Sequence, residues 1–198
     1  MVQTHRRREI EDVASDLFRE RGYAATSIRD IARALSVQGP SLYAHVTSKE
    51  DVLWAIVDRA ASRFEAAADA AEERARARHP GDAAARLVEL ARGHVRTIAE
   101  DVGAASVFVA EWRSLGPDRR AAILDRRDAY ERRFRDLVTA GIANGEFRMT
   151  DPVLAAMIIL GALNSIATWY DPTGRLPADR VADYAADLAV RTVAENLR

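Results

Sequence analysis

Residues 26–53 read TSIRDIARALSVQGPSLYAHVTSKEDVL, and this stretch decides the fold of the N-terminal part of the chain. Ser27 is followed by Asp30 three residues later, which is a variant of the capping box that begins a helix. Apolar residues then recur at helical spacing from Ile28 to Leu35. The first half of the stretch therefore predicts a short helix.

The second half of the stretch predicts another short helix after a very tight turn. Ser36 and Val37 form the turn, and Gly39 with Pro40 begins the helix, because proline is tolerated where its missing N–H would have no partner. The pattern ends at His45. Two short helices joined in this way and packed on a longer first helix have the geometry of a helix-turn-helix, whose second helix can enter the major groove of DNA.

Helical periodicity continues through the rest of the chain, in which alanine, leucine, arginine and glutamate dominate. We expect an all-α fold of about nine helices. The helices are expected over about five turns before Gly22, then at 28–35, 39–45, 49–78, 83–98, 104–115, 118–143, 152–170 and 178–198.

The net charge of the 198 residues is −1, so a protein that coats nucleic acid through its overall charge is not expected. Any contact with nucleic acid must therefore be local. The absence of cysteine excludes disulfides, thiolate metal sites and cysteine nucleophiles, and it is compatible with a reducing cytoplasm. We expect a cytoplasmic protein with no metal and no cofactor.

The N-terminal segment carries Arg6, Arg7 and Arg8 and lacks the apolar region of a signal peptide. These arginines are either a solvated tail or an arm that reaches the DNA backbone or minor groove. The longest apolar stretch, 153–163, is short of the roughly 20 residues that span a bilayer. It is therefore interpreted as a buried helix, and no membrane is expected.

The predicted second helix of the pair has an inner and an outer side. Val37 and Leu42 are expected to point inward, and the outward positions are Gln38, Ser41, Tyr43, Ala44 and His45. Glutamine and serine can hydrogen-bond to base edges, and tyrosine and histidine suit phosphates. The helix starts at Ser27 and Ser48 present N–H groups to phosphates, next to Arg29 and Lys49.

The first 55 residues resemble the N-terminal domain of the TetR family of transcriptional regulators. The resemblance rests on the order and spacing of Phe18, Gly22-Tyr23, Thr26-Ser27-Ile28, Asp30-Ile31-Ala32, Val37, Ser41-Leu42-Tyr43, His45 and Ser48-Lys49-Glu50-Asp51. It implies DNA-contact roles for Ser27, Arg29, Gln38, Gly39, Pro40, Ser41, Tyr43, His45 and Lys49. Replacing Tyr43 or Lys49 by alanine is then expected to weaken operator binding with little loss of folding.

Simpler roles stay open for several of these residues. Pro40 could only start its helix, His45 could only cap the end of it, and Ser48 caps the next helix in either case. Ser36 departs from the family, which usually has glycine in this turn, so a left-handed backbone there would be somewhat costly.

A boundary near residue 47 separates short, tightly connected helices from long ones. We expect a helix-turn-helix DNA-binding domain over 1–47 and a ligand-binding and dimerisation domain over 48–198. By the resemblance, two chains pair through their last two long helices. The sequence supports this independently, because the helix at 153–169 is apolar nearly all round, Gly161 permits close approach, and residues 181–192 carry an apolar stripe.

Polar and aromatic residues on inward helix faces indicate a ligand cavity in the larger domain. The candidate ligand-binding residues are His94, Phe108, Trp112, Arg127, Tyr130, Phe134, Asn164 and Trp169. Each aromatic residue could instead simply pack in the core, His94 could be a satisfied core histidine, and Arg127 could extend to solvent. Together they suit a long, mostly apolar molecule with one polar or anionic end.

Residues 161–176 are similar to the corresponding stretch of TetR regulators that control fatty-acid, steroid and aromatic-acid breakdown and respond to acyl-coenzyme A thioesters. The resemblance implies an acyl-CoA effector, with arginines meeting the phosphates of the coenzyme. A drug-like or other hydrophobic effector is the alternative.

The sequence therefore predicts a ligand-responsive repressor that binds a palindromic operator in double-stranded DNA as a homodimer. Two other classes of protein are the alternatives. A helical enzyme would need a catalytic motif, and no phosphate-binding loop, metalloprotease motif or nucleophile elbow is present, so no catalytic residue is assigned. A helical protein-interaction module would not shift DNA in a gel.

Overall fold

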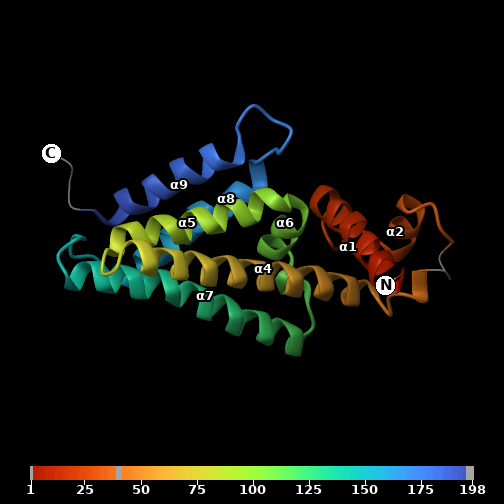
Figure 1. The fold of residues 1–198 in the computed structure, drawn as a ribbon. Coiled ribbons are helices and arrows are strands. Elements are labelled where there is room, and N and C mark those ends of the chain that lie inside the picture. The colour runs from red at the N-terminus through yellow and green to blue at the C-terminus, as the bar shows by residue number, and fades with distance from the viewer. Residues whose placement is uncertain (1, 39–41, 195–198) are drawn as a thin grey trace. The chain divides into compact units, whose positions relative to one another are not determined.

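The computed structural model describes residues 2–38 and 42–194, with side chains from residue 5 onward. These residues contain eight α-helices and one short 3₁₀ helix (Figure 1), which confirms the all-α fold. The elements are α1 (Val2–Arg21), α2 (Ile28–Ala34), α4 (Lys49–Arg78), α5 (Ala83–Glu100), α6 (Val102–Ala110), η1 (Trp112–Ser114), α7 (Pro117–Ala143), α8 (Pro152–Trp169) and α9 (Ala178–Val193).

Most helix starts follow from the residue just before the helix. The Asp82 side chain accepts a hydrogen bond from the N–H of Ala85 at 2.7 Å. Asp151 accepts hydrogen bonds from the N–H groups of Val153 and Leu154 at 2.8 and 3.2 Å. These carboxylates pair backbone donors that a helix start leaves without partners, so α5 and α8 begin where the sequence predicts.

Two helices differ from the expected bounds. The helix α1 begins at Val2, so the three arginines are part of a helix, and Arg7 pairs with Glu11 at 3.3 Å. The helix predicted at 104–115 ends at Ala110. There the N–H of Ser114 bonds to the carbonyl of Glu111 at 2.9 Å, and this tighter hydrogen-bond pattern replaces the α-helix.

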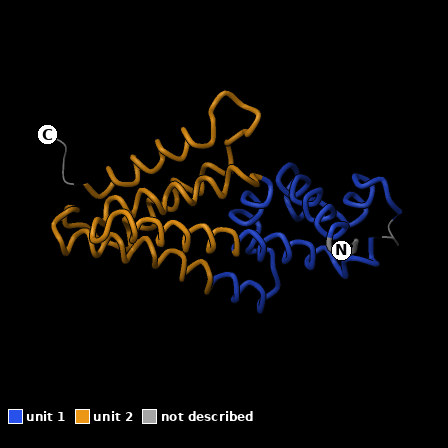
Figure 2. The backbone as a smooth tube through the Cα atoms, viewed as in Figure 1, with its two compact units in different colours: residues 1–61, 103–124 blue, residues 62–102, 125–198 orange. Residues whose placement is uncertain are grey.

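The chain forms two compact units, shown in blue and orange in Figure 2. The first unit contains residues 1–61 and 103–124, and the second contains 62–102 and 125–198. The helix-turn-helix segment therefore shares a compact unit with α6, η1 and the first turns of α7. The predicted boundary near residue 47 divides the chain by function and not by compactness. The two compact units therefore do not test it, and it stays a prediction.

In the second unit, α5 lies beside α9 along most of its length (Figure 1). Ala182, Ala186 and Ala189 of α9 are buried, and these small side chains let the two helices approach closely. At the edge of this contact Arg92 pairs with Asp183 at 2.7 Å and Arg96 with Asp179 at 2.8 Å. Because these pairs are exposed to solvent, the packing of the alanine stripe contributes more to the contact.

One side of α8 is buried and the other is exposed. The buried side faces the core of the second unit and includes Ile159, Leu163 and Ile166. By length and composition alone, α8 is long and apolar enough to cross a bilayer, and it is the one such helix among the described residues. The core helices of soluble proteins pass the same test, and a third of α8 is buried in the fold.

The end of α2 explains the unusual backbone of Ser36. Its N–H bonds to the carbonyl of Arg33 at 3.0 Å, and the N–H of Val37 bonds to the carbonyl of Ala32 at 3.0 Å. This pair of hydrogen bonds is the Schellman motif, which requires a left-handed residue directly after the helix. Ser36 fills that position with φ 56°, so the turn keeps the left-handed backbone although serine replaces the glycine usual in the family.

We expect Ser36→Gly to stabilise the protein by about 0.5 kcal/mol, because relief of the left-handed strain exceeds the extra entropy of glycine in the unfolded chain. Ser36 is exposed, so no packing is lost. Ala34→Gly is the matched control on α2 and should destabilise by about 1 kcal/mol. Chemical denaturation of both variants measures the two effects, and equal destabilisation would show that the strain at Ser36 is negligible.

Candidate functional site

The described part of the helix-turn-helix exposes most of the residues predicted to contact DNA. Tyr43 is 58% exposed, and Ser27, Arg29 and Gln38 are exposed as well. His45 is half-buried. The inward prediction for Leu42 is correct at 1% exposure, whereas Val37 is half-buried. The predicted contacts Gly39, Pro40 and Ser41 lie outside the described residues.

Ser27 is engaged in its own helix cap. Its hydroxyl donates to Asp30 at 2.5 Å, and its N–H donates to the same carboxylate at 2.9 Å. These two hydrogen bonds, the side-chain one first, hold the pKa of Asp30 below its usual range. A phosphate at this helix start must therefore compete with Asp30, and the exposed guanidinium of Arg29 is the better phosphate donor.

Lys49 makes contacts that the sequence does not reveal. Its ammonium donates to the backbone carbonyls of Tyr23 and Thr26, each at 2.8 Å, and lies 4.1 Å from the centre of the Tyr23 ring. An ammonium has three N–H donors, so one remains for a phosphate. These contacts argue against the expectation that Lys49 can be removed with little loss of folding, because two carbonyls would lose a charged donor.

The loop at 22–27 is held from three sides within the first unit. The hydroxyl of Thr26 lies 2.9 Å from the carbonyl of Gly22 within the loop and 3.4 Å from that of Leu17, which ties the loop to α1. Lys49 ties it to the start of α4. The N–H of Tyr23 donates to Glu111 at 3.0 Å, which ties it to the segment after α6. This loop directly precedes α2, so these contacts fix the position of the first helix of the pair.

Two more contacts join α4 to the corner before α7 in the same unit. The N–H of Gly116 donates to Glu50 at 3.1 Å, and Arg119 pairs with Asp51 at 3.3 Å. Arg119 also lies 5.5 Å from the centre of the Trp54 ring. The residues around 111–119 therefore contact the DNA-reading part of the chain at two places.

The second unit brings together part of the predicted ligand site. His94 of α5 is 3% exposed, and its Nδ1 lies 3.1 Å from the hydroxyl of Tyr130 of α7. The ring centres of His94 and Phe134 are 6.5 Å apart, and those of Tyr130 and Phe134 are 5.8 Å apart. Asn164 of α8 is half-buried and acts on the same imidazole. We call His94, Tyr130, Phe134, Asn164 and Phe64 the inner cluster.

Phe64 is the member of the inner cluster that is not among the predicted ligand-binding residues. Its ring centre lies 4.7 Å from that of His94 and 6.1 Å from that of Tyr130, closer to the imidazole than any predicted ring. The one signal for it in the sequence is its place on the apolar face of α4, which cannot distinguish a site residue from the core.

Burial dominates the electrostatics of the inner cluster. It lowers the pKa of His94 to about 3; Asn164 opposes this shift, and the charge of Arg127 adds to it. Burial likewise raises the pKa of Tyr130 well above its usual range. Both side chains are therefore uncharged at neutral pH.

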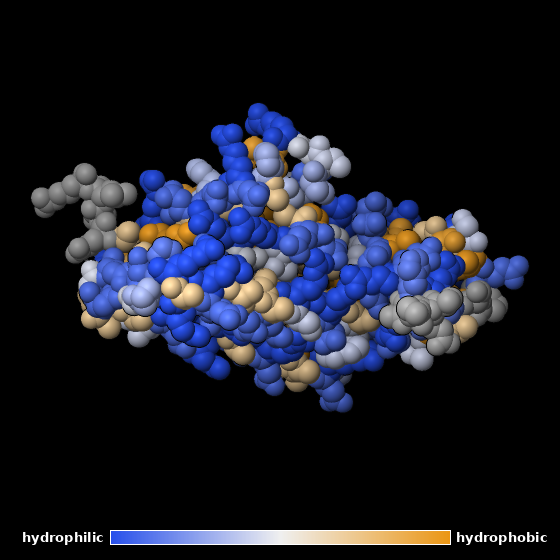
Figure 3. All heavy atoms as spheres, viewed as in Figure 1, coloured by the Kyte–Doolittle hydropathy of each residue, from blue (hydrophilic) through white to orange (hydrophobic). Residues whose placement is uncertain are grey.

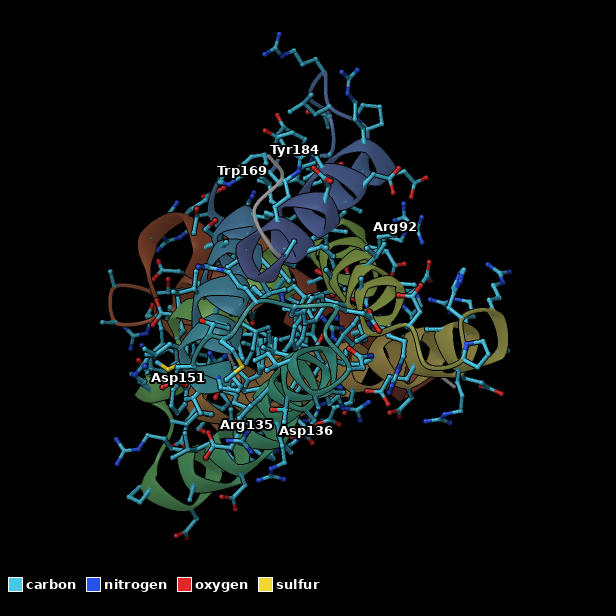
Figure 4. All side chains as sticks on the ribbon, turned by 90° about the vertical axis from the view of Figure 1, so that its left-hand side faces the viewer. Arg92, Arg135, Asp136, Asp151, Trp169 and Tyr184 are labelled. Carbon is cyan, nitrogen blue, oxygen red and sulfur yellow. The ribbon has the colours of Figure 1, made fainter. Side chains whose placement is uncertain are left out.

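Three predicted aromatic ligand residues are not among the residues of the inner cluster. Phe108 and Trp112 are 8% and 6% exposed and belong to the first compact unit. Trp169 is 53% exposed at the end of α8. It lines a groove between α8 and α9 and lies near Tyr184, which Figure 4 labels beside it.

The groove has a volume of about 570 Å³ and is almost entirely apolar. Besides Trp169 and Tyr184, its lining includes Ile158, Leu176, Arg180 and Leu188. Much of the face in Figure 3 is hydrophilic, with apolar atoms emerging beside α9. Further exposed apolar side chains continue along α8: Val153, Leu154 and Met157. We call the groove, together with these exposed side chains of α8, the α8–α9 face. Among the described residues, no cluster of histidine and carboxylate side chains could hold a metal ion.

We expect Lys49→Met to lower the free energy of unfolding by about 2 kcal/mol, because the carbonyls of Tyr23 and Thr26 lose a charged hydrogen-bond donor. Arg33→Met is the matched control, since Arg33 is exposed on α2. Denaturation is measured at one protein concentration. An unchanged unfolding midpoint for Lys49→Met would show that these hydrogen bonds contribute nothing to folding.

His94 should make the fold sensitive to acid. Its pKa is about 3 in the fold and about 6.5 in the unfolded chain, so between these values only the unfolded state binds the proton and stability falls as pH falls. From pH 7 to pH 5 the loss is about 2 kcal/mol. His94→Phe should lose less stability over this range than the native chain, and His79→Phe, at an exposed position, should lose as much. Denaturation at both pH values measures the difference.

Comparison with known proteins matches two stretches of the chain, one near each end. Residues 10–56 match the family described as bacterial regulatory proteins, tetR family, and residues 80–193 match the tetracyclin repressor-like C-terminal domain. The HTH-type transcriptional repressor KstR2 of Rhodococcus jostii (strain RHA1) is 30% identical over 187 residues, covering 89% of this chain and 85% of that protein.

Solved structures agree with the sequence matches. PfmR, a TetR family transcriptional regulator from Thermus thermophilus, is 32% identical with a TM-score of 0.79 and covers 92% of this chain and 97% of its own. AibR in complex with isovaleryl coenzyme A and operator DNA is 26% identical with a TM-score of 0.76 and the same coverage. This chain belongs to the TetR family of bacterial transcriptional regulators.

Proposed function

We propose that this TetR-family regulator is a repressor that binds a palindromic operator as a homodimer and leaves it when a small, largely apolar effector binds. The observation that carries the proposal is the exposed surface of the helix-turn-helix. Arg29, Gln38 and Tyr43 face solvent there, while Leu42 is fully buried behind them. This arrangement leaves polar side chains available to a DNA duplex.

The exposed residues divide into those that position the protein on the DNA backbone and those that read base edges. Arg29 is suited to a phosphate, and Tyr43 to a phosphate through its hydroxyl. Gln38 is suited to a base edge, where glutamine pairs with adenine. The roles of Gly39, Pro40 and Ser41, and the reach of Arg6–Arg8 toward DNA, belong to the same proposal on the strength of the family resemblance.

A gel-shift titration with the DNA upstream of the chain's own gene tests DNA binding. We expect Arg29→Ala and Tyr43→Ala each to weaken binding about ten-fold, and Arg29→Ala to reduce the salt slope of log K by about 1. Arg132→Ala, which removes an exposed arginine of α7, is the matched control and should bind normally. If the native chain shifts no DNA, including operators selected from random sequence, a protein-interaction module is the better assignment.

We assign the α8–α9 face to a second copy of the chain. Stable protein interfaces have an apolar centre, and this face exposes Leu154, Met157 and Ile158 in one row on α8. A side chain at Gly161 would meet no atom within 4 Å, so this side of α8 is open to a partner helix. The symmetry of such a pair would present two helix-turn-helix units to the two halves of a palindrome.

We expect Ile158→Glu to convert the dimer to a monomer at micromolar concentration, because a charge at the centre of an apolar interface loses its hydration. Leu124→Glu is the matched control, since Leu124 is 44% exposed on α7 and outside the α8–α9 face. Analytical ultracentrifugation measures the mass. A native chain that sediments as a monomer, or an Ile158→Glu variant that stays dimeric, contradicts this assignment.

The effector site is assigned to the inner cluster, with Arg127 nearby. Isovaleryl coenzyme A, the compound in complex with AibR, supports an acyl-CoA thioester as the effector class, with a drug-like hydrophobic compound as the alternative. The effector binds more tightly to the conformation in which the spacing of the two DNA-reading units does not match the two halves of the operator, and it thereby releases DNA. The free energy by which the conformational equilibrium shifts equals the difference in the effector's binding free energy for the two conformations. We place this activity in the cytoplasm and assign no catalytic residue.

A further inference from the structure

One nitrogen at the centre of the inner cluster has no hydrogen-bond partner. The Nε2 atom of His94 is buried and has no partner within hydrogen-bond distance among the described residues, although Nδ1 meets the hydroxyl of Tyr130 and the side chain of Asn164 acts on the ring. A buried polar atom left in this way is unfavourable, because it has lost its hydrogen bonds to water. Such an atom in the proposed effector site is a position that a bound molecule can satisfy.

The hydrogen bond at Nδ1, on the other side of the ring, decides whether Nε2 carries the ring proton. The hydroxyl of Tyr130 must donate somewhere, and the described residues give it one hydrogen-bond contact, Nδ1 of His94. If Tyr130 donates to Nδ1, the ring proton sits on Nε2. The opposite arrangement would leave two groups unsatisfied, the Tyr130 proton and the Nε2 lone pair. The pair is therefore best satisfied with Nε2 as a donor.

The surroundings of Nε2 select the kind of oxygen that it can meet. The ring of Phe64 lies 4.7 Å away and that of Phe134 6.5 Å away, centre to centre, so the setting is apolar. An anion placed there would lose its hydration, and the neutral imidazole offers it no positive charge in return. Arg127 is half-buried, and its charge acts on His94 from the edge of the cluster. An anionic part of the effector belongs near Arg127 instead.

We propose that the effector places an uncharged carbonyl oxygen on the Nε2–H of His94, beside Asn164, so that the site selects esters, thioesters and ketones over free carboxylic acids. The inference rests on the effector-responsive function proposed above and specifies the chemistry of that same site. The side chain of Asn164 acts on the same imidazole from α8, so the carbonyl oxygen would meet a neutral, polar neighbour there.

The test compares three compounds with the same acyl chain: methyl decanoate, decanoate and decanoyl coenzyme A. Binding is measured by calorimetry, and operator release by gel shift. For the native chain we expect the ester and the thioester to bind at least about ten-fold more tightly than the acid, which is about 1.4 kcal/mol. His94→Phe should remove this preference, and His94→Gln, which keeps an N–H donor, should retain part of it.

Controls separate the possible failures. His79→Gln, at an exposed histidine, should behave as the native chain, and thermal unfolding shows whether each variant is folded. Tighter binding of decanoate than of its ester, or an undiminished preference in both folded His94 variants, overturns the carbonyl assignment while the effector function stands. If none of the compounds binds, the proposed acyl-effector function is wrong, and this inference is wrong with it. The gel shift without compound still tests operator binding on its own.

Discussion

The arrangement of the DNA-reading unit depends on how the backbone of the loop at 22–27 is satisfied. A helix end and a tight loop leave carbonyl groups that no helix can pair. Lys49 supplies a single charged donor to the carbonyls of Tyr23 and Thr26, and it lies in the first turn of α4. This contact holds the loop against α4, and the Ser27–Asp30 cap then begins α2 at the end of the loop. The exposed side chains of α2 therefore depend on the loop for their position.

The same loop connects the DNA-reading helices to a distant part of the chain. Glu111 accepts the N–H of Tyr23, and the corner at 111–119 holds the start of α4 through Glu50 and Asp51. The helices α4 and α7 each contribute residues to both compact units. A change in the second unit therefore has two continuous helices through which to reach the corner and the loop. The route for a response to an effector therefore consists of the helices α4 and α7, which continue from one unit into the other, and of the contacts of the corner within the first unit.

The helix α8 combines two surfaces that the proposed function needs. Its inner side carries Asn164 to the imidazole of His94, and its outer side carries the apolar row of Leu154, Met157 and Ile158. A rigid helix cannot move one side without the other. Under the proposed function, any coupling between occupation of the inner cluster and pairing of two chains is reciprocal, so each would change the free energy of the other by the same amount.

The sequence by itself determined the helices and the family, because caps and apolar periodicity act over three or four residues. Asp82, Asp151 and Ser27 begin their helices as their local sequence indicates, and the spacing of residues 18–53 is sufficient to indicate the TetR family. Only the tertiary structure decided what long side chains touch. Lys49 meets carbonyls 23 and 26 residues away, and His94 meets Tyr130 36 residues away. It also separated Trp169 from the inner cluster and added Phe64 to it. These contacts depend on how helices pack against one another, which no local spacing encodes.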